Sequence, residues 1–163
     1  MSAYIHFFIR IGDVFQPIYE ESRAGMIYTY FEPFATWEKI TPLTEKDISY
    51  TRTTVNEEIL RVDQEVKEID ERCKLIGTFN NSMDEKLEAI NAEMTTKEHY
   101  LKERKPGLEH AISFCNFLDD LIESASNLKY YDTKGAILVD PDNYIYVGIE
   151  TGSYVTKGDI DEA

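Results

Sequence analysis

The pattern of apolar and polar residues divides the chain into strand-like ends and a helical middle. Residues 1–43 and 129–152 contain short apolar runs separated by turn residues, whereas apolar positions in residues 44–128 recur every three or four residues. Short extended runs are typical of strands, and a repeat near 3.6 is typical of helices. We therefore predict an α+β fold, in which N- and C-terminal hairpins form one antiparallel sheet and a coiled-coil-like insertion of three long helices projects from it. The whole chain, including an acidic tail at 153–163, is expected to form one domain.

The N-terminal part predicts a β-hairpin followed by a short helix. Residues 3–10 are rich in Ile, Phe and Tyr, the Gly-Asp pair at 12–13 offers a turn, and residues 14–19 resume an extended pattern. Pro17 has no N–H for a ladder, so the second strand should lie at a sheet edge or bulge there. Residues 22–31 favour a short helix, with a third strand as the competing assignment.

Residues 32–42 are predicted to form an aromatic connector between the hairpin and the helices. Pro33 and Pro42 oppose a continuing helix in this segment. Trp37 is the single tryptophan of the chain, and its large apolar ring is expected to be buried in the core.

The first long helix is the clearest feature of the sequence. Thr44 and Asp47 form a capping pair, and the helix that follows is expected to run for about 33 residues, or about 50 Å. Its apolar stripe is the candidate interaction or oligomerisation surface. The residues of that stripe are Val55, Ile59, Val62, Val66 and Ile69.

Two further helices are predicted after a polar interruption at 77–81. Ser82 and Glu85 form a second capping pair, so we expect a helical hairpin; because the heptad phase carries across the interruption, one continuous rod is the alternative. Pro106 should end the second helix and reverse the chain into a third, over residues 108–128. A second β-hairpin is then expected, with strands at 136–139 and 144–149.

The charge balance bears on possible partners. There are 31 acidic and 17 basic residues, for a net charge of −14. This charge opposes binding to phosphate backbones and anionic membranes, so nucleic acid and membrane partners are disfavoured, although an acidic mimic of nucleic acid would have the same composition. Residues 1–10 do not have the pattern of a secretion signal, and we expect a cytoplasmic protein with two free, buried thiols, Cys73 and Cys115.

Searches for catalytic and metal-binding motifs give negative expectations. The three histidines lie on separate predicted elements, so we assign no metal ligand, no cofactor and no catalytic residue. The one candidate ligand site combines guanidinium groups with aromatic rings that stack a base or hold a phosphate. Its residues are Arg10, Arg23, Tyr28, Tyr144 and Tyr146.

Three functional hypotheses follow. The leading one is a non-enzymatic protein-interaction module that forms a homo-oligomer through its long helices; acidic proteins of this style are often encoded by phages or mobile elements to bind and inhibit a host macromolecule. The second is a protein that binds or sequesters a small anionic, nucleotide-like ligand. The third, and least supported, is an acid–base hydrolase.

Overall fold

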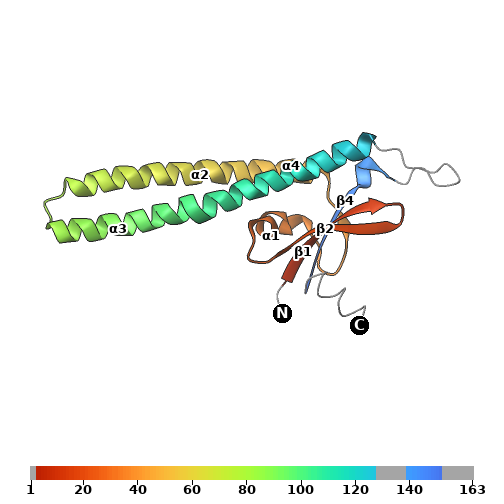
Figure 1. Ribbon diagram of the computed structural model, residues 1–163, viewed down its shortest axis with the longest axis horizontal. Helices are drawn as coiled ribbons and strands as arrows, with labels where there is room; N and C mark the ends of the chain where they lie inside the picture. The colour runs from red at the N-terminus through yellow and green to blue at the C-terminus, as the bar shows by residue number, and fades with distance from the viewer. Residues whose placement is uncertain (1–2, 128–138, 152–163) are drawn as a thin grey trace.

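The computed structural model describes residues 3–127 and 139–151. It consists of a small antiparallel sheet from which two long helices extend side by side, far beyond the sheet (Figure 1). The strands and helices, in chain order, are β1 (Ala3–Ile11), β2 (Val14–Ser22), α1 (Met26–Phe31), η1 (Glu32–Phe34), β3 (Thr41–Pro42), α2 (Glu45–Gly77), α3 (Met83–His99), η2 (Tyr100–Arg104), α4 (Lys105–Asn127), η3 (Pro141–Asn143) and β4 (Ile145–Thr151).

The sheet has the strand order β2-β1-β4-β3, with every neighbouring pair antiparallel. The predicted N-terminal hairpin is present. Its turn contains Gly12, whose φ angle of 61° is a backbone conformation that glycine adopts without strain. Pro17 lies on the edge strand β2, where the register shifts between Phe7 and Phe8. The proline is therefore both at an edge and at an irregularity. These observations confirm the α+β class and the antiparallel sheet that joins the two ends of the chain.

The C-terminal contribution to the sheet is β4, which pairs with β1 from Ile145 to Thr151. The turn before it is the short 3₁₀ helix η3, where the Asp140 carboxylate accepts a hydrogen bond from the Asp142 backbone N–H at 3.0 Å. The first strand of the predicted second hairpin, at 136–139, lies outside the described residues except for Val139, which is buried.

The connector at 35–42 differs from its prediction. Trp37 is 51% exposed, so the expectation that it is buried in the core is wrong. Its segment is held by backbone bonds instead: the Glu38 N–H donates to the Ile149 carbonyl at 2.8 Å, and the Ile149 N–H donates to the Thr36 carbonyl at 3.2 Å. The connector continues into β3 and completes the sheet on the far side of β4, which leaves the indole ring outside.

The predicted helical hairpin is present, and its first helix, α2, begins at the predicted capping pair. The Thr44 hydroxyl accepts from the Asp47 N–H and the Asp47 carboxylate accepts from the Thr44 N–H, which closes the predicted capping box at the start of α2. The chain reverses after Gly77, and Ser82 caps α3 by accepting from the Glu85 N–H. The two helices are antiparallel neighbours, so the structure has the hairpin and not the continuous rod.

The predicted reversal at Pro106 is wrong. The helix runs on from α3 through η2 into α4, so that the insertion has two long helices and not three. The π-helical turn η2 lets the helix continue past Pro106. In this turn the Lys105 N–H donates to the carbonyl of Tyr100, five residues back. This wider turn moves the preceding carbonyls away from the proline ring, which would clash with them in a regular α-helix.

The core lies where the sheet meets the helices. One face of β1 and β4 packs on α1 and α4. A cluster of aromatic rings lies at the centre of this contact. The centroid of the Phe114 ring is 4.7 Å from that of Phe7, 4.8 Å from that of Tyr19 and 5.7 Å from that of Phe31. Cys115 is fully buried beside this group, and burial raises the pKa of its thiol to about 11. Cys73 is half-buried, and both thiols are free.

A helix that spans a membrane would need a long apolar stretch. Within residues 3–127 and 139–151, no helix meets that requirement.

Candidate functional site

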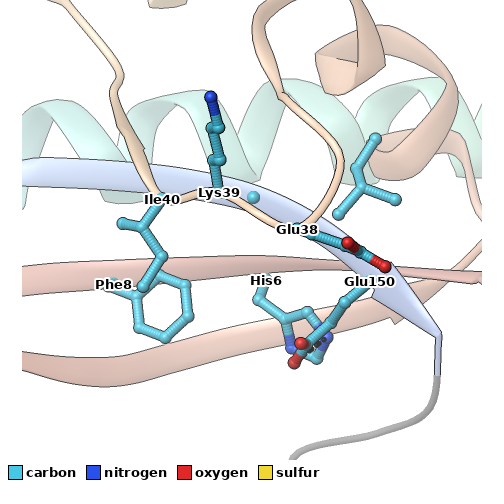
Figure 2. A pocket seen from close by; sticks show the side chains of 8 residues that line it. His6, Phe8, Glu38, Lys39, Ile40 and Glu150 are labelled. Atoms are coloured by element: carbon cyan, nitrogen blue, oxygen red, sulfur yellow. Dashed lines mark ion pairs between the residues drawn. The ribbon is translucent and has the colours of Figure 1, made fainter.

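A small hollow lies on the sheet face that points away from the helices (Figure 2). Its volume is about 160 Å³. It is lined by strands β1 and β4 and by the connector that crosses them, through His6, Phe8, Glu38, Lys39, Ile40, Gly148, Ile149 and Glu150. In Figure 2 the Ile40 side chain points toward the Phe8 ring, whereas the Lys39 side chain points away from the hollow.

His6 lies between two carboxylates in this hollow. It lies in β1 opposite Glu20 of β2 and Gly148 of β4, and only 2% of it is exposed. Its Nδ1 atom is 3.4 Å from Glu20 Oε2, and its Nε2 atom is 3.5 Å from Glu150 Oε1. Each ring nitrogen therefore lies near the carboxylate of a neighbouring strand segment. The group ties three strands together across the sheet.

Gly148 makes the hollow possible. A Cβ atom at this position would lie 2.5 Å from the Lys39 carbonyl oxygen, so any larger residue would push the connector off the sheet. Among the described residues, no group of three His, Cys, Asp or Glu side chains is arranged to hold a metal ion. The hollow therefore presents one histidine between two carboxylates, beside an apolar wall of Phe8 and Ile40.

The sequence pointed to a different ligand surface, and the structure brings only part of it together. Arg10 and Tyr146 are in contact: Arg10 Nη1 donates to the Tyr146 hydroxyl at 3.2 Å. Tyr144 lies beside Arg10, because the Arg10 backbone N–H donates a hydrogen bond to the Tyr144 backbone carbonyl. Arg23 and Tyr28 are elsewhere. The Arg23 N–H bonds to the Ala3 carbonyl at the other end of β1, and Tyr28 is buried in the core.

The predicted interaction stripe on α2 faces the second long helix of the same chain. Val55, Val62 and Ile69 are buried there, and Ile59 and Val66 are partly buried. Ion pairs flank the seam: Asp70 with Lys97 at 2.7 Å, Asp63 with Lys105 at 2.6 Å, and Arg72 with Glu93 at 3.0 Å. This stripe closes the hairpin, which leaves other side chains to face outward.

Large apolar side chains are exposed on both helices of the hairpin, including Leu60 and Leu75 on α2, and three of them form a regular row along α3 and η2. Leu87, Met94 and Leu101 are 49%, 43% and 43% exposed and follow one another at intervals of seven residues. We call these three residues the outer row. Two of them, Met94 and Leu101, line an open hollow of about 580 Å³ whose polar rim is Asn91, Thr95, Lys97, Glu98 and Lys102.

The outer row follows the heptad spacing of the sequence, and in the predicted three-helix insertion the third helix could have covered it. Because the chain does not reverse at Pro106, no third helix is supplied to cover that side of α3. The His6 group had a weaker signal: His6, Phe8 and Arg10 alternate with apolar residues in β1, but the partners Glu20 and Glu150 depend on a strand order that the sequence does not specify.

Comparison with known proteins gives no family: no protein-family model, no curated protein and no solved structure matches the chain.

Proposed function

We propose that this protein is a non-enzymatic protein-interaction module whose helical hairpin is the arm that contacts other polypeptide chains. The observation that carries the proposal is the outer row, three large apolar side chains on one face of a helix that extends beyond the sheet. Contiguous apolar side chains rimmed by polar ones are typical of interaction surfaces, whereas single exposed apolar residues are common everywhere.

The charge of the chain fits this role. A net charge of −14 keeps the molecule apart from other acidic surfaces, so an attractive contact has to be local. The rim of the outer row offers this, because it carries Lys97 and Lys102 beside Glu98 and is close to neutral. Apolar contact in the centre with mixed charge at the edge is the usual composition of a protein–protein interface.

A small-ligand function has less support from the geometry. Its two arginines lie at opposite ends of β1, and Arg10 is already engaged by the Gly12 carbonyl at 2.8 Å and by Tyr146. The two guanidinium groups of the predicted ligand surface therefore do not act together on one ligand.

The test is native mass spectrometry of the chain purified gently from its own cells, compared with the variant Met94→Glu. We expect assemblies heavier than the 18.9 kDa subunit, and their loss in the variant. Leu60→Glu is the matched control, because Leu60 is an exposed apolar residue on α2 outside the outer row, and it should leave assembly intact. Circular dichroism of both variants checks that the helices form. A wild-type chain that stays monomeric and without a companion at about 100 μM would contradict the proposal.

A further inference from the structure

The outer row is symmetric about its middle residue. Leu87 and Leu101 each lie seven residues from Met94, so the same apolar side chain recurs at equal distances on both sides. Seven residues are close to two helical turns, and the three side chains therefore point from one face of the helix over about 21 Å. A two-fold axis through Met94 would place Leu87 of one copy against Leu101 of the other.

We propose that the outer row is a homodimer interface, in which α3 and η2 of a second copy pack antiparallel on α3 and η2, with Met94 at the two-fold axis. This inference rests on the proposed function and names the partner as the chain itself. A two-fold contact uses the same patch on both subunits, which is what a row symmetric about one residue supplies.

The charges beside the row decide the direction of the two helices. Glu88 follows Leu87 and Lys102 follows Leu101, and both side chains are exposed. In an antiparallel pair, Glu88 of each copy lies near Lys102 of the other, which gives two attractive pairs. In a parallel pair the two-fold axis would run along the helices. It would set the two Glu88 side chains, and likewise the two Lys102 side chains, on opposite sides of the seam, and Glu88 would not meet Lys102. The attractive pairs therefore favour the antiparallel arrangement.

Lys102 already has a partner within its own helix, and this partner does not block the proposal. Its Nζ atom lies 2.5 Å from Glu98 Oε1, with the two side chains 71% and 59% exposed. Exposed pairs four residues apart on a helix contribute little to stability, so exchanging one for another costs little. The short length of the row predicts a small interface, and a dissociation constant in the micromolar range.

Cysteine crosslinking tests the axis directly. In a Cys73→Ser background, which removes the half-buried native thiol, Met94→Cys should form a disulfide-linked dimer under mild oxidation because the two thiols face each other at the axis. Leu87→Cys alone should crosslink poorly with itself, whereas a mixture of Leu87→Cys and Leu101→Cys chains should form the mixed dimer. Leu60→Cys is the control for random collision.

Charge exchange tests the direction independently. Glu88→Lys and Lys102→Glu should each weaken dimerisation about fivefold in sedimentation equilibrium, and the double variant should recover most of the loss because the attractive pairs are restored in reverse. If Leu87→Cys crosslinks with itself faster than the mixture does, the antiparallel arrangement is wrong.

The outcomes separate this inference from the proposed function. Crosslinking of Met94→Cys no faster than that of Leu60→Cys overturns the dimer. If the wild-type chain then carries a different protein that Met94→Glu releases, the interaction module stands with another partner. A bare monomer in every experiment overturns both.

Discussion

The two ends of the long helix that runs from α3 through α4 differ sharply in burial. Near the sheet, α4 buries the side chains Leu108, Ala111, Phe114, Cys115, Leu118, Ile122 and Ala125. At the far end, α3 has no buried side chain, although its apolar residues also recur every three or four positions. A single continuous helix therefore passes from a well-formed core into a surface.

The difference comes from the number of layers. Around α4, α2 packs on one side and the sheet with α1 packs on the other, so a wide face is covered. Along α3, α2 covers one side, and the outer row remains at its edge. An apolar repeat specifies which residues face a partner, but the number of partners depends on where the other elements end.

The largest expected effect contrasts two leucines on the same helix. Leu118→Ala should lower the free energy of unfolding by about 3–5 kcal/mol, because the side chain is fully buried and its loss leaves a cavity. Leu87→Ala makes the same chemical change in the outer row and should cost less than about 1 kcal/mol. Urea denaturation of both variants, below the concentration at which the chain associates, gives the two values. Equal losses would mean that the far end is covered after all.

Substitution of two glycines by alanine should give a second contrast in stability, smaller than that of the two leucines. Gly148→Ala should destabilise the protein by about 1–3 kcal/mol, because the new methyl group meets the Lys39 carbonyl oxygen at 2.5 Å. At the tip of the hairpin, a Cβ atom on Gly77 meets nothing within 4 Å. Gly77→Ala should therefore be neutral or stabilise the protein by up to about 1 kcal/mol. Thermal unfolding measures both, and a stable Gly148→Ala protein would show that the connector moves freely.

The helical hairpin could be predicted from the sequence because its signals are local. The capping box of Thr44 with Asp47 and the alternating steps of α2 depend on residues a few positions apart. The N-terminal hairpin was predictable for the same reason, since its turn glycine lies between the two strands and its proline lies in the second strand.

Two kinds of feature were not predictable: those that depend on residues far apart in sequence, and those in which a local change of helix type accommodates an unfavourable residue. Pro106 normally ends a helix, and only the wider turn at Tyr100–Arg104 lets the chain continue. Trp37 has the composition of a core residue, but pairing of its backbone with Ile149 leaves the ring outside. The His6 group joins the N-terminal hairpin to β4, which is far away in sequence, so its two carboxylates could not be chosen among the 31 acidic residues.

A smaller effect is expected at Glu58, where α2 meets the start of α4. Hydrogen bonds from Arg61 and Arg104 lower the pKa of Glu58 to about 2, from an ordinary value of 4.5. A lowered pKa contributes stability above pH 4.5 that is lost as the pH falls toward 2. Glu58→Gln should cost about 1–2 kcal/mol at pH 7, with the difference from wild type disappearing near pH 2. A difference that stays constant from pH 7 to pH 2 would exclude the charge as its cause.

The smallest effect is expected at the matching ion pair of the far end. Arg72 on α2 donates to Glu93 on α3 through two bonds, at 3.0 and 3.1 Å, but the arginine side chain is 45% exposed. Its carboxylate partner Glu93 is 25% exposed, against 18% for Glu58, and Glu58 is held by a second arginine, Arg104, which is 31% exposed. Dissolved ions screen exposed charges much more than partly buried ones. Arg72→Gln should therefore lower the melting temperature less than Glu58→Gln does, and about 0.5 M NaCl should remove most of the Arg72 effect while much of the Glu58 effect remains. Equal salt sensitivity would imply that the two ends of the hairpin are equally open to solvent, against the difference in layers from which the outer row follows.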